Sequence, residues 1–138
     1  MTRLNPYISF KDNAREAMEF YQSVLGGELT VDTFGSYDMG QNPADNDRIM
    51  HAQLETPDGF TLMASDTPSS MPYNKPAGVS ISVSGDDEAQ LQGFWDGLND
   101  GGSIVMPFET PPWGGRFGML TDKFGIDWMI ALNASPAA

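Results

Sequence analysis

The sequence contains no cysteine, which excludes disulfide bonds, thiolate nucleophiles and zinc–thiolate sites. It has a single histidine, His51, so only one imidazole is available for proton transfer. No apolar run approaches the roughly 18 residues that a membrane-spanning helix requires. Residues 1–5 also lack the apolar region of a secretion signal. We therefore predict a cytoplasmic protein that does not span a membrane.

Basic residues are scarce. The chain has 7 lysines and arginines against 19 acidic residues, which gives a net charge of −12 and a pI near 4.1. Such a charge repels phosphate groups, so neither nucleic acid nor an anionic membrane is an expected partner. It would attract a cationic ligand, but it also serves simply to keep a protein in solution.

The length of 138 residues suits one domain, and we predict a single domain over residues 1–138. The most regular pattern lies in residues 48–65. Before a tight turn at 57–59, apolar and polar residues alternate, which predicts a strand with two different faces. The apolar set is Met50, Ala52 and Leu54, and the polar set is His51, Gln53 and Glu55.

Two helices are predicted by apolar residues that recur at helical spacing, at 14–25 and at 91–98. Each is preceded by a pattern typical of a capping box and followed by a pair of glycines. The capping pairs are Asn13 with Glu16 and Asp87 with Gln90, and the glycine pairs are Gly26–Gly27 and Gly101–Gly102.

The two halves repeat one plan of strand, helix and three further strands. We predict an α+β fold of two βαβββ modules, at about 1–66 and 78–133, joined by a proline-rich linker at 66–77. A polar segment at 35–47 is expected to be an exposed loop. Because one helix covers only one face of its sheet, two modules side by side should form a curved mixed sheet with a concave cavity.

Four motifs carry a resemblance to a known family: residues 17–27, 48–52, 113–119 and 121–129. In these segments the chain resembles the PhnB-like branch of the vicinal oxygen chelate superfamily, which includes glyoxalase I, extradiol dioxygenases and bleomycin-resistance proteins. The resemblance implies the glyoxalase/bleomycin-resistance fold, a small-molecule ligand and a homodimer. The branch also carries a demethylubiquinone methyltransferase label, but no glycine-rich loop follows a strand and opens a helix here.

Metal enzymes of this superfamily hold a divalent ion with four side chains on the concave face. The resemblance carries those positions onto Pro6, Met63, Ser80 and Met129. None of the four offers the imidazole or carboxylate that such ions prefer. We therefore expect no bound metal and no cofactor.

Strand alternation and the resemblance together predict what lines the cavity. His51 and Gln53 turn away from the helix, opposite to Met50, Ala52 and Leu54. In the second module Val79, Ile81 and Val83 are expected to face the helix, which leaves Ser80 and Ser82 in the cavity. The resemblance adds Met63 and Met129. Thioether, hydroxyl, imidazole and amide groups in one cavity suit an apolar or aromatic small molecule.

His51 is the one candidate general acid or base, and the alternative is a structural or ligand-contacting histidine. Glu55 is expected to be too far along the strand to form a direct dyad with it. Trp113, Arg116 and Phe117 lie around Pro111-Pro112 and Gly114-Gly115, where they would form a lid over the cavity. The alternative is that Trp113 and Phe117 pack the junction between modules or between subunits.

Three functions remain open from the sequence. The first is a small-molecule binding protein that works without the divalent metal. The second is a metal-independent isomerase or lyase that uses His51 as general acid or base. The third is an interaction module whose cavity is filled by its own side chains, such as Met63, Phe117 and Met129.

Overall fold

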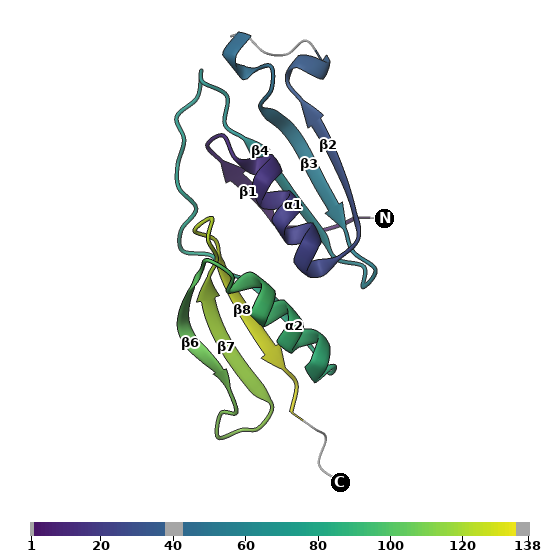
Figure 1. Ribbon diagram of the computed structural model, residues 1–138, viewed down its shortest axis with the longest axis vertical. Helices are drawn as coiled ribbons and strands as arrows, with labels where there is room; N and C mark the ends of the chain where they lie inside the picture. Colours follow the sequence, from purple (N-terminus) through teal and green to yellow (C-terminus); the bar gives the residue numbers. More distant parts are fainter. Residues whose placement is uncertain (1, 38–42, 135–138) are drawn as a thin grey trace. The chain divides into compact units, whose positions relative to one another are not determined.

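The computed structural model describes residues 2–37 and 43–134 (Figure 1). The chain divides into two compact units, Met1–Pro76 (unit 1) and Ala77–Ala138 (unit 2). Part of the expected loop, residues 38–42, and part of the C-terminal tail, residues 135–138, lie outside the described residues. Neither described helix has the length and apolarity that crossing a bilayer would need.

Unit 1 is a four-stranded sheet with one helix against it. Its elements are β1 (Tyr7–Phe10), α1 (Ala14–Leu25), β2 (Glu28–Thr33), the 3₁₀ turns η1 (Gly35–Tyr37) and η2 (Pro43–Asp45), β3 (Ile49–Glu55) and β4 (Thr61–Asp66). The strand order is β1-β4-β3-β2. β1 runs parallel to β4, and the other pairs are antiparallel.

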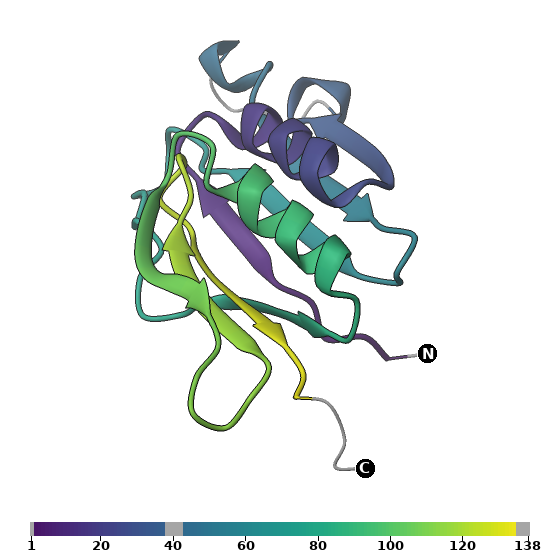
Figure 2. The same ribbon diagram turned by 60° about the horizontal axis from the view of Figure 1, so that its bottom comes forward.

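Unit 2 repeats this topology with β5 (Ile81–Gly85), α2 (Glu88–Leu98), β6 (Ser103–Glu109), β7 (Arg116–Thr121) and β8 (Asp127–Leu132). The strand order is β5-β8-β7-β6, and β5 is parallel to β8. Figures 1 and 2 show each helix lying against one face of its own sheet. The predicted α+β fold of two βαβββ modules is therefore confirmed. The joining of the sheets around one cavity, and the single-domain assignment, stay predictions.

Each core lies between the helix and the sheet of its unit. In unit 1 the buried residues of the helix face those of the strands: Ala17, Met18, Tyr21 and Leu25 from α1, and Ile8, Phe10, Ala52, Leu54, Leu62 and Ala64 from the sheet. Full burial of one large apolar side chain contributes about 1.5 to 3 kcal/mol. In unit 2 the corresponding residues are Leu91, Phe94, Trp95 and Leu98 from α2, with Val83, Phe108, Leu120, Trp128 and Ile130.

The last hairpin of each unit is built on the same turn. Gly59 and Gly125 have φ values of 87° and 85°, in the left-handed region that favours glycine. Their N–H groups donate to the carbonyl oxygens of Thr56 and Asp122, at 3.0 and 2.9 Å. The tight turn expected at 57–59 is confirmed, and unit 2 has the same turn at Gly125.

The two helices begin differently. At α2 the carboxylate of Asp87 accepts a hydrogen bond from Gln90 N at 3.1 Å, as the capping pattern predicts. At α1 the residue in the N-cap position is Asn13, but its side chain makes no capping bond. The capping box predicted there is wrong, because the first N–H of the helix is bound by Asp66 from β4 instead.

Two residues expected to face the helices do not. The β2–β3 register shifts between Asp32 and Thr33. This irregularity buries Ile49 beside Ala52 and leaves Met50 only half-buried. Val79 is 79% exposed, because the observed strand β5 begins only at Ile81, two residues later than the alternation predicted.

The segment expected to link the modules is fastened to unit 1 at its start. Thr67 donates from both its N–H and its hydroxyl to the carbonyl oxygen of Phe10, at 2.8 and 2.9 Å. The hydroxyl of Ser69 donates to Asp45 at 2.8 Å. Asp45 is only 2% exposed, although it lies in the segment predicted to be an exposed loop. The carboxylate of Asp45 thus ties the linker to that segment.

Candidate functional site

The face of the unit 1 sheet opposite α1 carries polar side chains from all four strands. We call it the helix-free face of unit 1. Strand pairing places neighbours on it directly across from one another, as in Asp32 with His51 and Gln53 with Met63. Its residues are Tyr7, Ser9, Thr30, Asp32, His51, Gln53, Glu55, Thr61, Met63 and Ser65.

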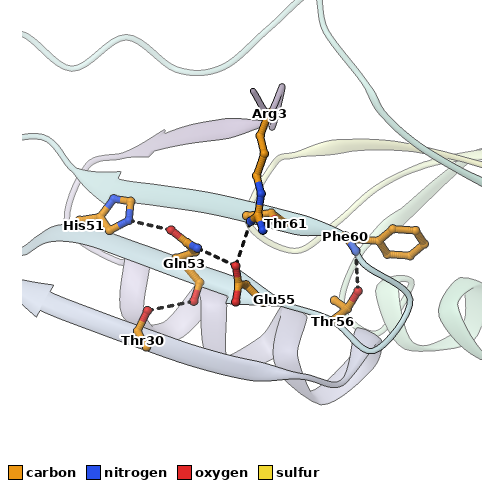
Figure 3. A network of polar contacts seen from close by, with 8 residues as sticks. All are labelled: Arg3, Thr30, His51, Gln53, Glu55, Thr56, Phe60 and Thr61. Atoms are coloured by element: carbon orange, nitrogen blue, oxygen red, sulfur yellow. Dashed lines mark hydrogen bonds and ion pairs between the residues drawn. The ribbon is translucent and has the colours of Figure 1, made fainter. Parts of the chain in front are cut away.

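A chain of polar contacts runs along β3 on this face (Figure 3). His51 Nε2 lies 3.4 Å from Gln53 Oε1. Gln53 Nε2 donates to Glu55 Oε1 at 3.0 Å. The same carboxylate oxygen is paired with the guanidinium of Arg3 at 3.0 Å. We call these four residues the His51–Arg3 chain.

The chain refines the expectation that Glu55 and His51 form no direct dyad. Gln53 lies between the two and contacts both, so the carboxylate acts on the imidazole through an amide. Sequence reasoning missed Arg3, which precedes β1 and reaches β3 only through the fold. The guanidinium of Arg3 also donates to the hydroxyl of Thr61 at 3.4 Å.

His51 has an aromatic neighbour and an acidic neighbour on this face. The centroid of the Tyr7 ring lies 6.0 Å from that of His51, and the rings are tilted by 39°. Asp32 stands opposite on β2. The structure brings His51 and Gln53 to one face, as strand alternation predicts, together with Met63, which the resemblance added. Their role in binding a ligand stays a prediction.

A pocket of about 420 Å³ opens at one end of this face. Its wall is formed by the end of β1, the start of β3, the end of β4 and the segment that follows β4. We call it the unit 1 pocket; its lining residues are Ser9, Phe34, Met50, Ser65, Asp66, Thr67, Pro68, Met71, Pro72 and Asn74. Sequence reasoning did not find it, because much of its wall comes from the segment predicted to be a linker.

The polar groups of the pocket fall into two classes. The carboxylate of Asp66 is already used, since Oδ1 accepts from Ala14 N and Oδ2 accepts from Ile49 N, both at 2.8 Å. Ser9 and Ser65 are direct neighbours across the β1–β4 pair. Within the part of the chain that the structure describes, neither hydroxyl has a hydrogen-bond partner. These two hydroxyls are therefore available to a ligand.

The site residues predicted in unit 2 do not all lie on one face of its sheet. Ser82 pairs with Met129, and Phe117 and Met119 lie on the same face of the sheet as Met129. Ser80 lies just before β5 rather than within it. The loop between β6 and β7 carries Trp113, which is 75% exposed.

Arg116 does not lie with Phe117 on that face. The guanidinium lies over the ring of Phe108 at 4.0 Å and donates to the Phe108 carbonyl oxygen at 2.8 Å. Phe108 in turn stacks on Trp95 of α2, with ring centroids 5.4 Å apart. The expected grouping of Arg116 with Phe117 is corrected: Arg116 belongs to the helix-covered face of unit 2, and we leave it out of the candidate site.

Metal-binding groups are sparse in both units. Among residues 2–37 and 43–134, no three His, Asp or Glu side chains gather closely enough to hold an ion. Of the positions that the superfamily uses, Met63 stands beside Gln53 and Met129 beside Ser82. Thioether, amide and hydroxyl groups do not fit a divalent ion that prefers imidazole or carboxylate.

Comparison with known proteins identifies the family. The sequence model of the family described as 3-demethylubiquinone-9 3-methyltransferase matches residues 2–131. The chain belongs to this family. The predicted PhnB-like branch of the glyoxalase/bleomycin resistance/dioxygenase superfamily is thereby confirmed.

Solved structures agree with the fold. Protein PA1353 from Pseudomonas aeruginosa is 38% identical to this chain, with a TM-score of 0.82 over 98% of this chain and all 100% of that one. The PhnB protein from Bacillus cereus is similar at 23% identity and a TM-score of 0.76, over 96% and 100%. A glyoxylase/bleomycin resistance protein/dioxygenase domain from Frankia is similar at 16% identity and a TM-score of 0.62, over 96% and 98%. The chain has the glyoxalase/bleomycin-resistance fold.

Proposed function

We propose that this PhnB-like protein binds a small apolar or aromatic molecule in the unit 1 pocket, without a divalent metal. The observation that carries the proposal is the pocket itself. Its volume of about 420 Å³ lies within the range of small-molecule sites. Phe34, Met50 and Met71 supply an adaptable apolar wall, and sulfur atoms pack favourably against aromatic rings.

The polar groups restrict the ligand further. Two neighbouring hydroxyls, those of Ser9 and Ser65, offer hydrogen bonds, and no cationic side chain is found among the described residues that line the pocket. The net charge of −12 opposes anions as well. A neutral ring system with one or two polar substituents fits these features better than a phosphate or a carboxylate.

Binding of 2-naphthol, followed by equilibrium dialysis, tests the proposal. We expect saturable binding to the wild-type protein and at least a tenfold weaker affinity in Ser65→Phe, whose ring fills the pocket. The same substitution at Ser84, an exposed position on β5, is the matched control and should leave the affinity unchanged. Absence of saturable binding, or equal binding by Ser65→Phe, contradicts the proposal.

A second candidate function is a metal-independent isomerase or lyase with His51 as general acid or base. The observation that favours it is the His51–Arg3 chain. In this chain the His51 imidazole contacts Gln53, which is bonded to Glu55, and catalytic bases in enzymes are likewise oriented by a neighbouring polar group. Exchange of the α-hydrogens of 2-tetralone in D₂O, followed by proton NMR, tests it. Exchange by the wild-type protein that is lost in His51→Asn supports the enzyme, and equal rates contradict it.

We also propose that the protein is a homodimer. On the edge strand β6, Ile104, Val105 and Met106 are 57%, 63% and 47% exposed. Exposed apolar side chains on an edge strand favour contact with another chain. Native mass spectrometry reports the oligomer together with any retained ligand or metal. The cytoplasmic location stays a prediction.

A further inference from the structure

The orientation of the Gln53 side chain is fixed by its neighbour Glu55. An ionised carboxylate can only accept hydrogen bonds, so Gln53 must present its NH₂ group to it. The 3.0 Å contact from Gln53 Nε2 to Glu55 Oε1 has this polarity. Arg3 is paired with the same oxygen at 3.0 Å, and the two side chains are 57% and 52% exposed. The carbonyl oxygen of Gln53 therefore points the other way along β3.

That oxygen meets His51. Since Gln53 Oε1 only accepts, the ring nitrogen Nε2 at 3.4 Å must carry a proton to bond to it. A neutral imidazole has one N–H, so Nδ1 then keeps its lone pair. The other groups around the ring are Tyr7 and Asp32, and among the described residues no hydrogen bond to Nδ1 is formed by either.

His51 also adjoins the unit 1 pocket. The pairing of β3 with β4 ends at Ala52 and Ala64, and the next residues of the two strands toward the pocket are His51 and Ser65. Ser65 lines the pocket, as does Met50 beside His51. His51 is not itself among the lining residues, so a ligand must extend from the pocket past Ser65 to contact the imidazole.

We infer that Gln53 and Glu55 are positioning residues that hold neutral His51 as its Nε2–H tautomer, and that the ligand presents an O–H group to Nδ1. The ligand class is then a phenol or an enol rather than an ether. The ligand part of this inference rests on the proposed function, whereas the tautomer does not.

The single histidine makes the tautomer directly measurable. Labelling with ¹⁵N-histidine gives ring signals from His51 alone, and at a pH where the ring is neutral we expect Nε2 to be protonated and Nδ1 to be bare. Exchanging the charges, in the double variant Arg3→Glu/Glu55→Lys, keeps an ion pair but replaces the acceptor by a donor. Gln53 should then turn its oxygen toward the lysine and its NH₂ toward His51. The tautomer should change to Nδ1–H.

Three outcomes overturn the positioning role. These are an Nδ1–H tautomer in the wild-type protein, an unchanged tautomer in the folded charge-exchange variant, and an unchanged tautomer population in Gln53→Leu. The variant Gln53→Glu, which keeps an acceptor next to the ring, should retain Nε2–H. A purely structural role for the ion pair predicts no change of tautomer when the charges are exchanged.

The ligand part is tested by 2-naphthol and 2-methoxynaphthalene, which share a ring system and differ by the hydroxyl proton. The wild-type protein should bind 2-naphthol about three- to tenfold more tightly, the contribution of one hydrogen bond. The charge-exchange variant should lose that preference. Equal affinities in the wild-type protein overturn the ligand class but leave the proposed function intact. If neither probe binds, the proposed function fails as well, while the NMR result still decides the tautomer.

Discussion

The backbone N–H of Ala14, the first residue of α1, donates a 2.8 Å hydrogen bond to Oδ1 of Asp66, the last residue of β4. The other carboxylate oxygen accepts from Ile49 N at the start of β3. Asp66 is buried. A single side chain thus joins the helix N-terminus, β3 and β4, and places a negative charge where the helix dipole favours one.

Replacing Asp66 by alanine should destabilise unit 1 severely. The change leaves two buried N–H groups without a partner and removes a charge from the helix N-terminus. We expect a loss of about 2 to 4 kcal/mol in the free energy of unfolding. Urea unfolding measured by circular dichroism checks this value. The control is Asp12→Ala at an exposed position just before α1; an equal loss there would contradict the role assigned to Asp66.

The two hairpin turns should differ in their sensitivity to truncation. In unit 2 Asp122 accepts hydrogen bonds from Phe124 N, Ile126 N and Trp128 Nε1. At the corresponding place in unit 1, Thr56 Oγ1 accepts from Phe60 N. We expect Asp122→Ala to cost about 2 to 4 kcal/mol and Thr56→Ala about 1 kcal/mol. Thermal unfolding of both variants measures the difference, and a larger loss in Thr56→Ala would reverse the ranking.

The turns and the second helix start were predictable from sequence because their contacts are local. Gly125 occupies the same place in its turn as Gly59 does in the first turn. Asp87 caps α2 by accepting a hydrogen bond from the backbone N–H of Gln90, three positions further on. The start of α1 was mispredicted for the opposite reason. Asp66 is separated from Ala14 by 52 positions in the sequence, so a pattern of neighbouring residues cannot predict their hydrogen bond.

The same reasoning applies to the candidate site. Alternation along β3 was enough to place His51 and Gln53 on the helix-free face. The pocket depends on a register shift beside Met50 and on a proline-rich segment that returns to the sheet, and neither can be read from spacing. Arg3 was missed because its partner Glu55 is far from it in the sequence and lies near it only in the folded chain.

Replacing Arg116 by methionine should affect stability but not ligand binding. The guanidinium contacts both the ring and the carbonyl oxygen of Phe108 on the helix-covered face of unit 2. We expect a loss of about 1 to 2 kcal/mol in the free energy of unfolding. Arg116→Lys keeps the charge but not the planar group, and should recover only part of the loss. Dialysis with 2-naphthol should give the wild-type affinity for both variants, and a weaker affinity would return Arg116 to the site.

A single methyl group should have opposite effects at two glycines of unit 2. A Cβ at Gly118 on β7 would lie 2.7 Å from the Trp95 ring and 2.8 Å from the Phe108 backbone, so the stack of these rings requires glycine there. We expect Gly118→Ala to cost about 1 to 3 kcal/mol through overpacking. Gly93 lies within α2, and a Cβ there meets nothing within 4 Å. Gly93→Ala should therefore stabilise the protein by about 0.5 to 1 kcal/mol, because alanine favours the helix. Thermal unfolding measures both changes, and equal signs would show that packing against Trp95 does not decide the residue at position 118.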